Sequence, residues 1–288
     1  MYHFNVLLKK PKGLCITPYF DKVTNIPHPC GHCVHCRAQK KVAWSSRVIA
    51  DYYAYHQKAI FLTLDYQDAY LPNARPVYNE VTGECYYYKS GLPRLTGDLC
   101  RPHANNFLMK FRSKFKRKYG FMPEIKYFLV GEYGSRFGRP HYHALILGLD
   151  INQVEVMELL KSCWSYGRCT IEKPRNAEHC IKYISSYLFD SIGSKSQFMD
   201  TYKVSQTPFC NVSKGFGKAL IEHKLNEINY NAQRLNITPA EVVLNNLWND
   251  NPNKKVYYHC LLTYNNAGKI ERCPRYVVHK VLEAIGLR

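Results

Sequence analysis

Hydrophobic and polar positions alternate most clearly between residues 126 and 148. Lys126–Gly131 predicts an apolar strand, a loop rich in glycine and arginine follows, and His141–Leu147 predicts a second strand. The segment is therefore expected to form a hairpin. Because successive side chains of a strand point to opposite faces, His141 and His143 are expected to share a face that Tyr142 does not.

Amphipathic stretches with helical spacing lie on either side of this hairpin. In chain order, the predicted elements are a helix at Gln39–His56, a strand at Ile60–Leu64, a helix at Pro102–Tyr119, the hairpin, a helix at Asn152–Trp164, a strand at Gly167–Ile171 and a helix at Asn176–Phe189. The positions expected to face the core are Phe107, Leu108, Phe111 and Phe115 in one helix and Val154, Met157, Leu160 and Cys163 in the next. This order predicts an α+β fold, a ferredoxin-like antiparallel sheet with helices on one face.

The segments outside these elements contain fewer regular patterns. Residues 66–100 and 190–218 are expected to be loops, with a hairpin near Thr82-Gly83. Near the C-terminus we expect helices at Ala219–Asn229 and Pro239–Trp248, a hairpin of Val256–Thr263 and Lys269–Cys273 that turns at residues 265–268, and a short final helix. The chain is accordingly divided into a cysteine-rich region with a helix (1–56), the ferredoxin-like domain (57–200) and a C-terminal extension packed on it (201–288).

A formal net charge of +18 over 288 residues makes the protein strongly basic. Lysine and arginine occur throughout the chain, a distribution typical of proteins that bind nucleic acid rather than anionic membranes. The 24 tyrosines interleave with these basic residues, and aromatic rings stack on unpaired bases. No stretch approaches the roughly 20 apolar residues of a membrane span, and the apolar run before Lys9 is too short for a secretory leader.

The carboxylate of Glu132, at the end of the first hairpin strand, is expected to lie across from His141 and His143. Two imidazoles and a carboxylate on one face are suited to a divalent cation with open coordination positions. Glu124 lies at the far end of that strand, and Asp65 is a candidate partner outside the ligand set.

Cysteines near the N-terminus have the spacing of a metal site. Cys30, Cys33 and Cys36 follow a C-x2-C-x2-C pattern, and Cys15 is the preferred fourth ligand for a structural zinc ion. His28, His32 and His35 are alternatives to Cys15, and an iron–sulfur cluster would accept the same thiolates. Twelve cysteines without a secretory leader favour a reducing compartment.

Tyr183 and Tyr187 lie four residues apart in the predicted third helix and therefore share one of its faces. A phenol has a pKa near 10 and needs activation to act as a nucleophile. A Tyr-x3-Tyr pair has little meaning alone among 24 tyrosines, but it gains meaning beside a candidate metal site about 40 residues upstream.

Taken together, these segments resemble the replication initiators of gokushovirus-type microviruses. These initiators are two-tyrosine members of the HUH endonuclease superfamily. The resemblance rests on the cysteine run Pro29–Arg37, Phe61–Leu64, His141-Tyr142-His143, Tyr183–Tyr187, Phe209–Gly217 and Pro274-Arg275-Tyr276. It covers roughly residues 15–276 in the order of the family.

The resemblance implies a rolling-circle initiator that nicks and joins single-stranded DNA at a phage origin. A tyrosine would form a 5′-phosphotyrosyl intermediate and leave a 3′-hydroxyl for host helicase and polymerase in the bacterial cytoplasm. It assigns Mg2+ or Mn2+ to His141, His143 and Glu132, and the nucleophiles to Tyr183 and Tyr187. The residues expected to contact DNA are Arg136, Arg139, Lys214, Lys218 and Arg275.

Two features depart from the pattern of the family. Lysines are expected soon after the second tyrosine, but Leu188-Phe189-Asp190 follows it, so Lys182 is the candidate to assist at the phosphate. The cysteine run also contains additional histidines. The alternative is a non-catalytic nucleic-acid-binding protein with a structural zinc ion. A hydrolase that activates water at the two histidines is a third reading.

Overall fold

The computed structural model describes residues 15–20, 22, 27–31, 33–180, 183, 203–250, 263–266, 269–273 and 275–287. These residues belong to two compact units. The first contains residues 1–54, 177–185 and 215–288, and the second contains residues 55–176 and 186–214.

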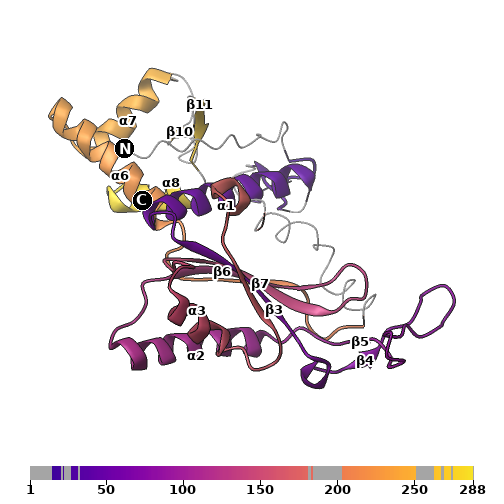
Figure 1. Ribbon diagram of the computed structural model, residues 1–288. Helices are drawn as coiled ribbons and strands as arrows, with labels where there is room; N and C mark the ends of the chain where they lie inside the picture. Colours follow the sequence, from indigo (N-terminus) through magenta and orange to yellow (C-terminus); the bar gives the residue numbers. More distant parts are fainter. Residues whose placement is uncertain are drawn as a thin grey trace. The chain divides into compact units, whose positions relative to one another are not determined.

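A five-stranded antiparallel sheet forms the centre of the second unit (Figure 1). Its strands, in sheet order, are β8 (Cys169–Glu172), β3 (Ala59–Asp65), β7 (Pro140–Leu147), β6 (Lys126–Tyr133) and β9 (Phe209–Val212). The first four strands follow the ferredoxin-like order, in which the first strand lies between the third and the fourth. The α+β class predicted from the sequence is confirmed.

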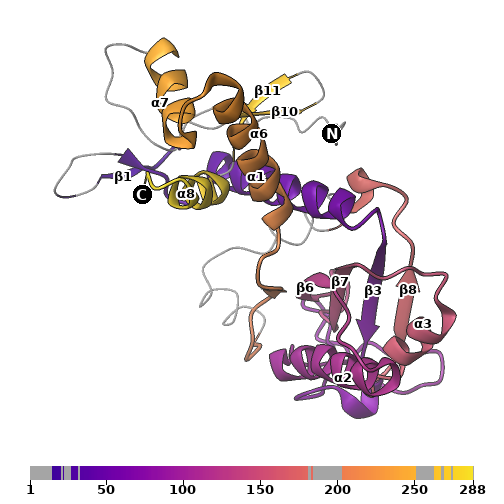
Figure 2. The ribbon, with the colours of Figure 1, turned by 90° about the vertical axis from the view of Figure 1, so that its left-hand side faces the viewer.

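Two helices, α2 (Arg101–Tyr119) and α3 (Val154–Lys161), cover one face of this sheet (Figure 2). The predicted stripe of α2 is buried, and Phe107 and Phe111 are no more than 1% exposed. They share a single hydrophobic cluster with Leu62, Leu129 and other alternate strand positions. Helix and strand periodicities therefore direct their apolar sides to the same layer.

Helix α3 differs in phase from the prediction. Val154 is the first helical residue and is 68% exposed, whereas Val156, Met157 and Leu160 are buried. The prediction that Val154 faces the core is therefore wrong. Counting inward positions from this terminal residue placed the apolar stripe incorrectly by part of a turn.

Strand β9 lies in a segment that the sequence predicted to be loops. It pairs with β6 from Phe128↔Val212 to Gly131↔Phe209. Gly131 makes this pairing possible, because a Cβ atom at that position would lie 2.9 Å from the Phe209 ring. The short, mixed sequence of β9 carries no alternation that would have distinguished it from a loop.

The residues between β3 and α2 include an arm, residues 75–96, beside the 3-10 helix η1 (Asp68–Tyr70). Strands β4 (Arg75–Pro76) and β5 (Leu95–Thr96) pair at its base. Isolated bridges join Tyr78 to Cys85 and Tyr87 to Pro93 farther along. The expected turn near Thr82-Gly83 is present, with the Gly83 amide donating to the Asn79 carbonyl at 2.9 Å.

The first unit is mainly helical, with α1 (Val34–Ala54), α6 (Lys218–Leu235), α7 (Pro239–Asp250) and α8 (Arg275–Ala284). Two short hairpins accompany them: β1 (Tyr19–Phe20) with β2 (Pro27–His28), and β10 (Thr263–Asn266) with β11 (Lys269–Arg272). Thr238 and Glu241 cap α7 reciprocally, because the Thr238 amide donates to Glu241 at 2.7 Å and the Glu241 amide to Thr238 Oγ1 at 3.2 Å.

Two boundaries in this unit correct the expectations. Helix α1 begins at Val34 rather than Gln39, so Cys36 lies in its first turn. Asn265 and Asn266 belong to β10 rather than to a turn. Most of the strand predicted at Val256–Thr263 lies outside the described residues. Within those residues, no helix is long and apolar enough to cross a membrane.

Candidate functional site

Strands β6 and β7 bring the three predicted metal ligands together. Glu132 pairs directly with His141 in the antiparallel register, and His143 follows two positions later on the same strand. Tyr142, between the histidines, points to the opposite face and is fully buried in the core. The hairpin thus extends two residues beyond the predicted strand end and places Glu132 inside β6.

The ligand atoms lie at distances suited to one small cation. Glu132 Oε1 is 2.8 Å from His141 Nε2 and 3.2 Å from His143 Nε2. Ligands at right angles in an octahedral site, each about 2.1 Å from Mg2+, would be about 3.0 Å apart. All three side chains keep between 13% and 23% of their surface exposed, so the group is open on one side.

Both imidazoles are oriented through the nitrogen that faces away from Glu132. His141 Nδ1 lies 3.1 Å from the Arg139 carbonyl oxygen, which accepts a hydrogen bond from it. His143 Nδ1 lies 3.2 Å from Thr63 Oγ1 on β3. Protonation at Nδ1 leaves Nε2 as the metal-binding atom, and such outer contacts fix the tautomer and ring orientation of ligand histidines.

The ionisation of the group reflects burial and mutual contact. Burial lowers the pKa of His141, but hydrogen bonds to Glu132 and the Arg139 carbonyl outweigh it, and the net shift is upward. Burial raises the pKa of Glu132, and hydrogen bonds from His141 and His143 outweigh it, giving a net lowering. In the metal-free protein a proton shared with Glu132 therefore takes the place that a cation would fill.

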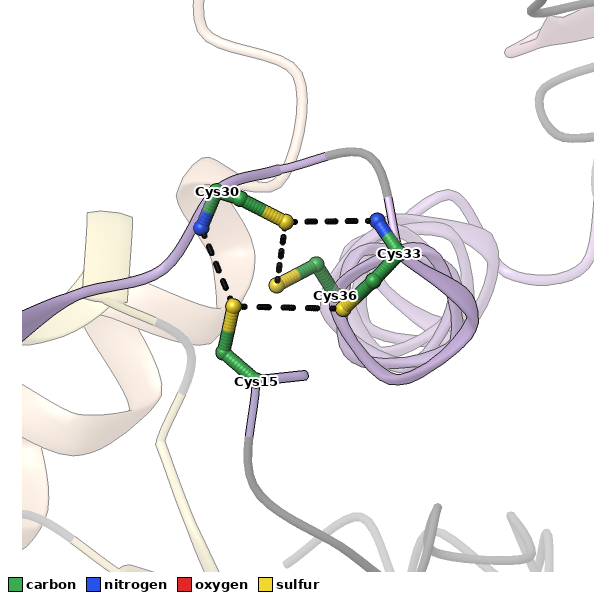
Figure 3. A group of neighbouring side chains, drawn as sticks. All are labelled: Cys15, Cys30, Cys33 and Cys36. Carbon is green, nitrogen blue, oxygen red and sulfur yellow. Dashed lines mark hydrogen bonds between the residues drawn. The ribbon is translucent and has the colours of Figure 1, made fainter. Parts of the chain in front are cut away.

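The predicted cysteine cluster is also assembled (Figure 3). The sulfur atoms of Cys30 and Cys36 are 3.9 Å apart, as are those of Cys33 and Cys15. Zinc–sulfur bonds of about 2.3 Å in tetrahedral geometry place ligand sulfurs about 3.8 Å apart. The amides of Cys30 and Cys33 donate to the sulfurs of Cys15 and Cys30, at 3.2 and 3.3 Å.

Local structure explains how these thiols meet. Gly31 has a φ of 79°, which turns the chain between Cys30 and the start of α1. Cys33 and Cys36 then lie at the beginning of the helix, three residues apart and on one side of it. Among the alternatives to Cys15, His28 stacks on Tyr19 with ring centroids 5.2 Å apart, and His32 lies outside the described residues.

The predicted tyrosine motif is described in part. Residues 177–180 and Tyr183 are helical, and the Tyr183 side chain is half-buried. Tyr183 belongs to the first unit and the Glu132 group to the second. Lys182 and Tyr187 lie outside the described residues.

The five residues predicted to contact DNA have different surroundings. Arg139 serves the fold itself: its guanidinium pairs with Asp68 at 2.7 Å and donates to the Tyr66 carbonyl at 2.7 Å. Lys218 pairs with Glu222 on the surface of α6, and Lys214 is exposed. Arg136 is exposed over the Phe137 ring, and Arg275 begins α8.

The glycine-rich loop before α6 does not present its backbone amides to solvent. The Gly217 and Ala219 amides donate to the buried Asp51 carboxylate at 2.6 and 3.3 Å. Asp51 thereby satisfies the helix N-terminus that a phosphate would otherwise occupy. Any phosphate contact in this loop rests on its lysine side chains.

Sequence reasoning did not predict that Thr63 orients His143. The available signal was weak: Thr63 and Asp65 alternate with Leu62 and Leu64 in a mostly apolar strand. Only the pairing of Thr63 with His143 and of Asp65 with His141 shows that these polar positions share the metal-binding face. Asp65 forms an ion pair with Arg168 at 3.2 Å.

Residues 59–191 match the family model of the Replication-associated protein ORF2. The chain belongs to this family. The matched segment contains β3, the Glu132, His141 and His143 group, and both tyrosines of the predicted motif. The cysteine cluster lies outside it.

Two curated proteins are similar to this chain at a comparable level. The Replication-associated protein ORF2 of Spiroplasma virus 4 is 28% identical over 218 residues. The Replication-associated protein VP4 of Bdellovibrio phage phiMH2K is 26% identical over 220 residues. Each match covers 70% of this chain, and the chain spans 59% of the length of either relative.

A distant likeness exists among solved structures. The N-terminal nuclease domain of the minute virus of mice non-structural protein-1 is 14% identical, with 63% of this chain and 83% of that chain covered. The TM-score of 0.22 is too low to support a functional argument.

Proposed function

We propose that this protein initiates rolling-circle replication by nicking and rejoining single-stranded DNA through a phosphotyrosyl intermediate. The observation that carries the proposal is the convergence of Glu132, His141 and His143 at 2.8 and 3.2 Å on one open face of the sheet. Membership of a replication-associated family supports the same activity. Both curated relatives belong to viruses of bacteria, which supports action in the host cytoplasm.

Individual side chains have distinct parts in the proposed reaction. The Tyr183 or Tyr187 oxygen attacks the scissile phosphorus and loses its proton, an oxygen–phosphorus bond forms, and the bond to the 3′ oxygen breaks. The 3′ oxygen takes up a proton and becomes the hydroxyl that host polymerase extends after helicase opens the duplex. Lys182 assists at the phosphate, and the second tyrosine repeats the attack when the origin is regenerated.

Mg2+ or Mn2+, when bound, supplies charge stabilisation at the scissile phosphate. Glu132, His141 and His143 are the residues to hold it. The ring contacts to Thr63 and to the Arg139 carbonyl keep both Nε2 atoms directed at that position. One face stays exposed, which leaves room for phosphate oxygens.

The cysteine cluster has a separate role in the proposal. Four thiolates in tetrahedral spacing are typical of a structural zinc site, and a closed set of this kind leaves no position for substrate. Zn2+ there would join the segment around Cys15 to the start of α1. The cluster thus stabilises the first unit and does not take part in cleavage.

The decisive experiment incubates the protein with Mn2+ and a labelled single strand that carries the origin. A covalent adduct that survives denaturing electrophoresis is expected from the wild type and not from the double variant Tyr183→Phe/Tyr187→Phe. Tyr230→Phe, at a 64% exposed tyrosine, is the matched control and should retain the adduct.

Two results would replace the proposal with another reading. Cleavage without any adduct would identify a hydrolase that activates water at His141 and His143. Tight binding without cleavage, at every Mn2+ concentration, would identify a non-catalytic zinc-containing nucleic-acid-binding protein.

A further inference from the structure

The arm, residues 75–96, is attached firmly to the loop that precedes the metal-binding strand. The Phe137 ring in that loop contacts Tyr86 at 5.3 Å and lies 4.7 Å from the Arg94 guanidinium, which also covers the Tyr88 ring at 4.6 Å. At its base, Thr96 Oγ1 donates to the Gly138 carbonyl at 2.6 Å. These contacts fix the arm relative to the hairpin.

Arg139 joins the arm to the metal site directly. Its guanidinium donates to the Leu95 carbonyl at 3.0 Å, and its own carbonyl accepts from His141 Nδ1 at 3.1 Å. A ligand held on the arm would therefore keep a fixed position relative to the metal-binding histidines. This is the kind of preorganisation that places a substrate for reaction.

A cavity of about 450 Å³ lies between the arm and the end of β3. Asp65, Tyr88, Arg139 and Arg168 are among its lining residues. Asp65 pairs with His141 across the sheet, so the cavity begins one strand away from the metal site and reaches the arm at Tyr88. Its volume falls in the range of about 300–1,000 Å³ for ligand pockets.

The outer side of the arm carries aromatic rings that the fold does not bury. Tyr86 and Tyr88 contact the hairpin and Arg94, and Tyr87 between them is 59% exposed because strand side chains alternate. Tyr78, in the neighbouring bridge, is 58% exposed. Lys89 and Arg136 are exposed in the same part of the chain. Exposed rings interleaved with cations suit a strand whose bases are unpaired.

We propose that the arm is a stacking platform for unpaired bases of single-stranded DNA next to the scissile position, with Tyr78 and Tyr87 as the base-contacting residues. The strand would pass from the metal site through the cavity to the arm. This inference depends on the proposed function and adds to it the surface that holds the flanking nucleotides. Stacking tolerates any base, so the arm supplies affinity and placement rather than sequence readout.

The test measures binding of a fluorescent oligodeoxythymidine of about 20 nucleotides, long enough to extend beyond any single contact site. Tyr78→Ser/Tyr87→Ser should weaken binding by about tenfold for each ring removed. The slope of affinity against salt should stay unchanged, because no cation is lost. Tyr230→Ser, a 64% exposed tyrosine on α6, is the control and should bind as the wild type does. Thermal unfolding checks that each variant is folded.

The outcomes separate the two proposals. If the double variant binds the oligonucleotide as well as the wild type, the platform is wrong, while a wild-type adduct with origin DNA would keep the proposed function. If a duplex of equal length loses affinity to the same extent, the arm contacts the backbone and not bases, and the inference fails. If the wild type binds no single strand, both proposals fail. Photo-crosslinking with 5-iododeoxyuridine should, on the proposal, label Tyr78 or Tyr87, and labelling confined to other residues would overturn it.

Discussion

The Thr63 hydroxyl lies 3.2 Å from Nδ1 of His143, on the edge of the ring opposite the nitrogen that faces Glu132. These two residues are 80 positions apart in the chain and meet because β3 and β7 pair in register. The contact fixes how one of two predicted ligand histidines is turned. It therefore allows the metal site to be tested without removing a ligand.

Replacing Thr63 by valine should weaken Mn2+ binding about tenfold, since outer contacts of ligand histidines are worth 10- to 100-fold in metal affinity. The methyl group fills the same volume, but the ring loses the partner of Nδ1. Isothermal titration with Mn2+ measures the change. Thr63→Ser retains the hydroxyl and should bind nearly as well as the wild type. Equal losses for serine and valine would show that packing, not the hydrogen bond, matters at this position.

The four-cysteine cluster predicts one zinc ion per chain. Cys15→Ser should release it, because three thiolates leave a tetrahedral site incomplete. Metal analysis of the purified protein measures the zinc content, and thermal unfolding should show a lower midpoint. Cys210→Ser changes an exposed cysteine of β9 and should keep the full content. Retained zinc in Cys15→Ser would assign the fourth ligand to another residue, such as His35.

Asp98 should make the stability of the protein sensitive to acid. It is 4% exposed and accepts hydrogen bonds from Asn73 at 3.0 Å, Arg75 at 2.9 Å and the Ser205 hydroxyl at 2.6 Å. Burial alone raises the pKa of Asp98, but these donors outweigh it and lower the pKa. A lowered folded pKa stabilises the protein above the unfolded value of about 3.9, and the contribution disappears as the pH falls through the folded pKa.

Asp98→Asn therefore should lower the free energy of unfolding at neutral pH by about 2 kcal/mol, the value of hydrogen bonds to a charged group. Urea unfolding across the acid range measures the difference between the two proteins. That difference should shrink below about pH 4 as the wild-type carboxylate becomes protonated. A constant difference at all pH values would mean that shape rather than charge is responsible.

Tyr142 should contribute to stability through its hydroxyl. The phenol accepts a hydrogen bond from the Cys100 amide at 2.8 Å and lies 2.8 Å from the Tyr66 hydroxyl. Tyr142→Phe leaves the Cys100 amide without this partner, which should cost about 1–3 kcal/mol of unfolding free energy. Urea unfolding measures it, and Tyr230→Phe should be neutral. A loss below about 0.5 kcal/mol would mean that the network relaxes around the missing oxygen.

Much of the fold could be predicted because its signals are local. The alternation around His141, Tyr142 and His143 assigned each side chain to a face, and the structure has them on those faces. The stripe of Phe107, Leu108, Phe111 and Phe115 likewise indicated the buried side of α2. Periods of 2 and 3.6 residues follow from backbone geometry, so a few neighbouring residues suffice to show them.

Other features depended on which distant segments pair. No local pattern indicated that Phe209–Val212 would extend the sheet beside β6, or that Thr63 would reach His143. Arg139 was predicted to contact DNA, whereas its guanidinium pairs with Asp68 and its carbonyl orients His141.

The sequence by itself therefore determined the chemistry present: two imidazoles on one face, four thiols in a metal-site spacing and a basic, tyrosine-rich chain. The tertiary structure decided how that chemistry is held, through strand register, the contacts of the ring nitrogens and the attachment of the arm. Local periodicity reports only the face on which a side chain lies. The neighbour across the sheet is set by burial summed over segments far apart in the chain, and no short stretch of sequence contains that sum.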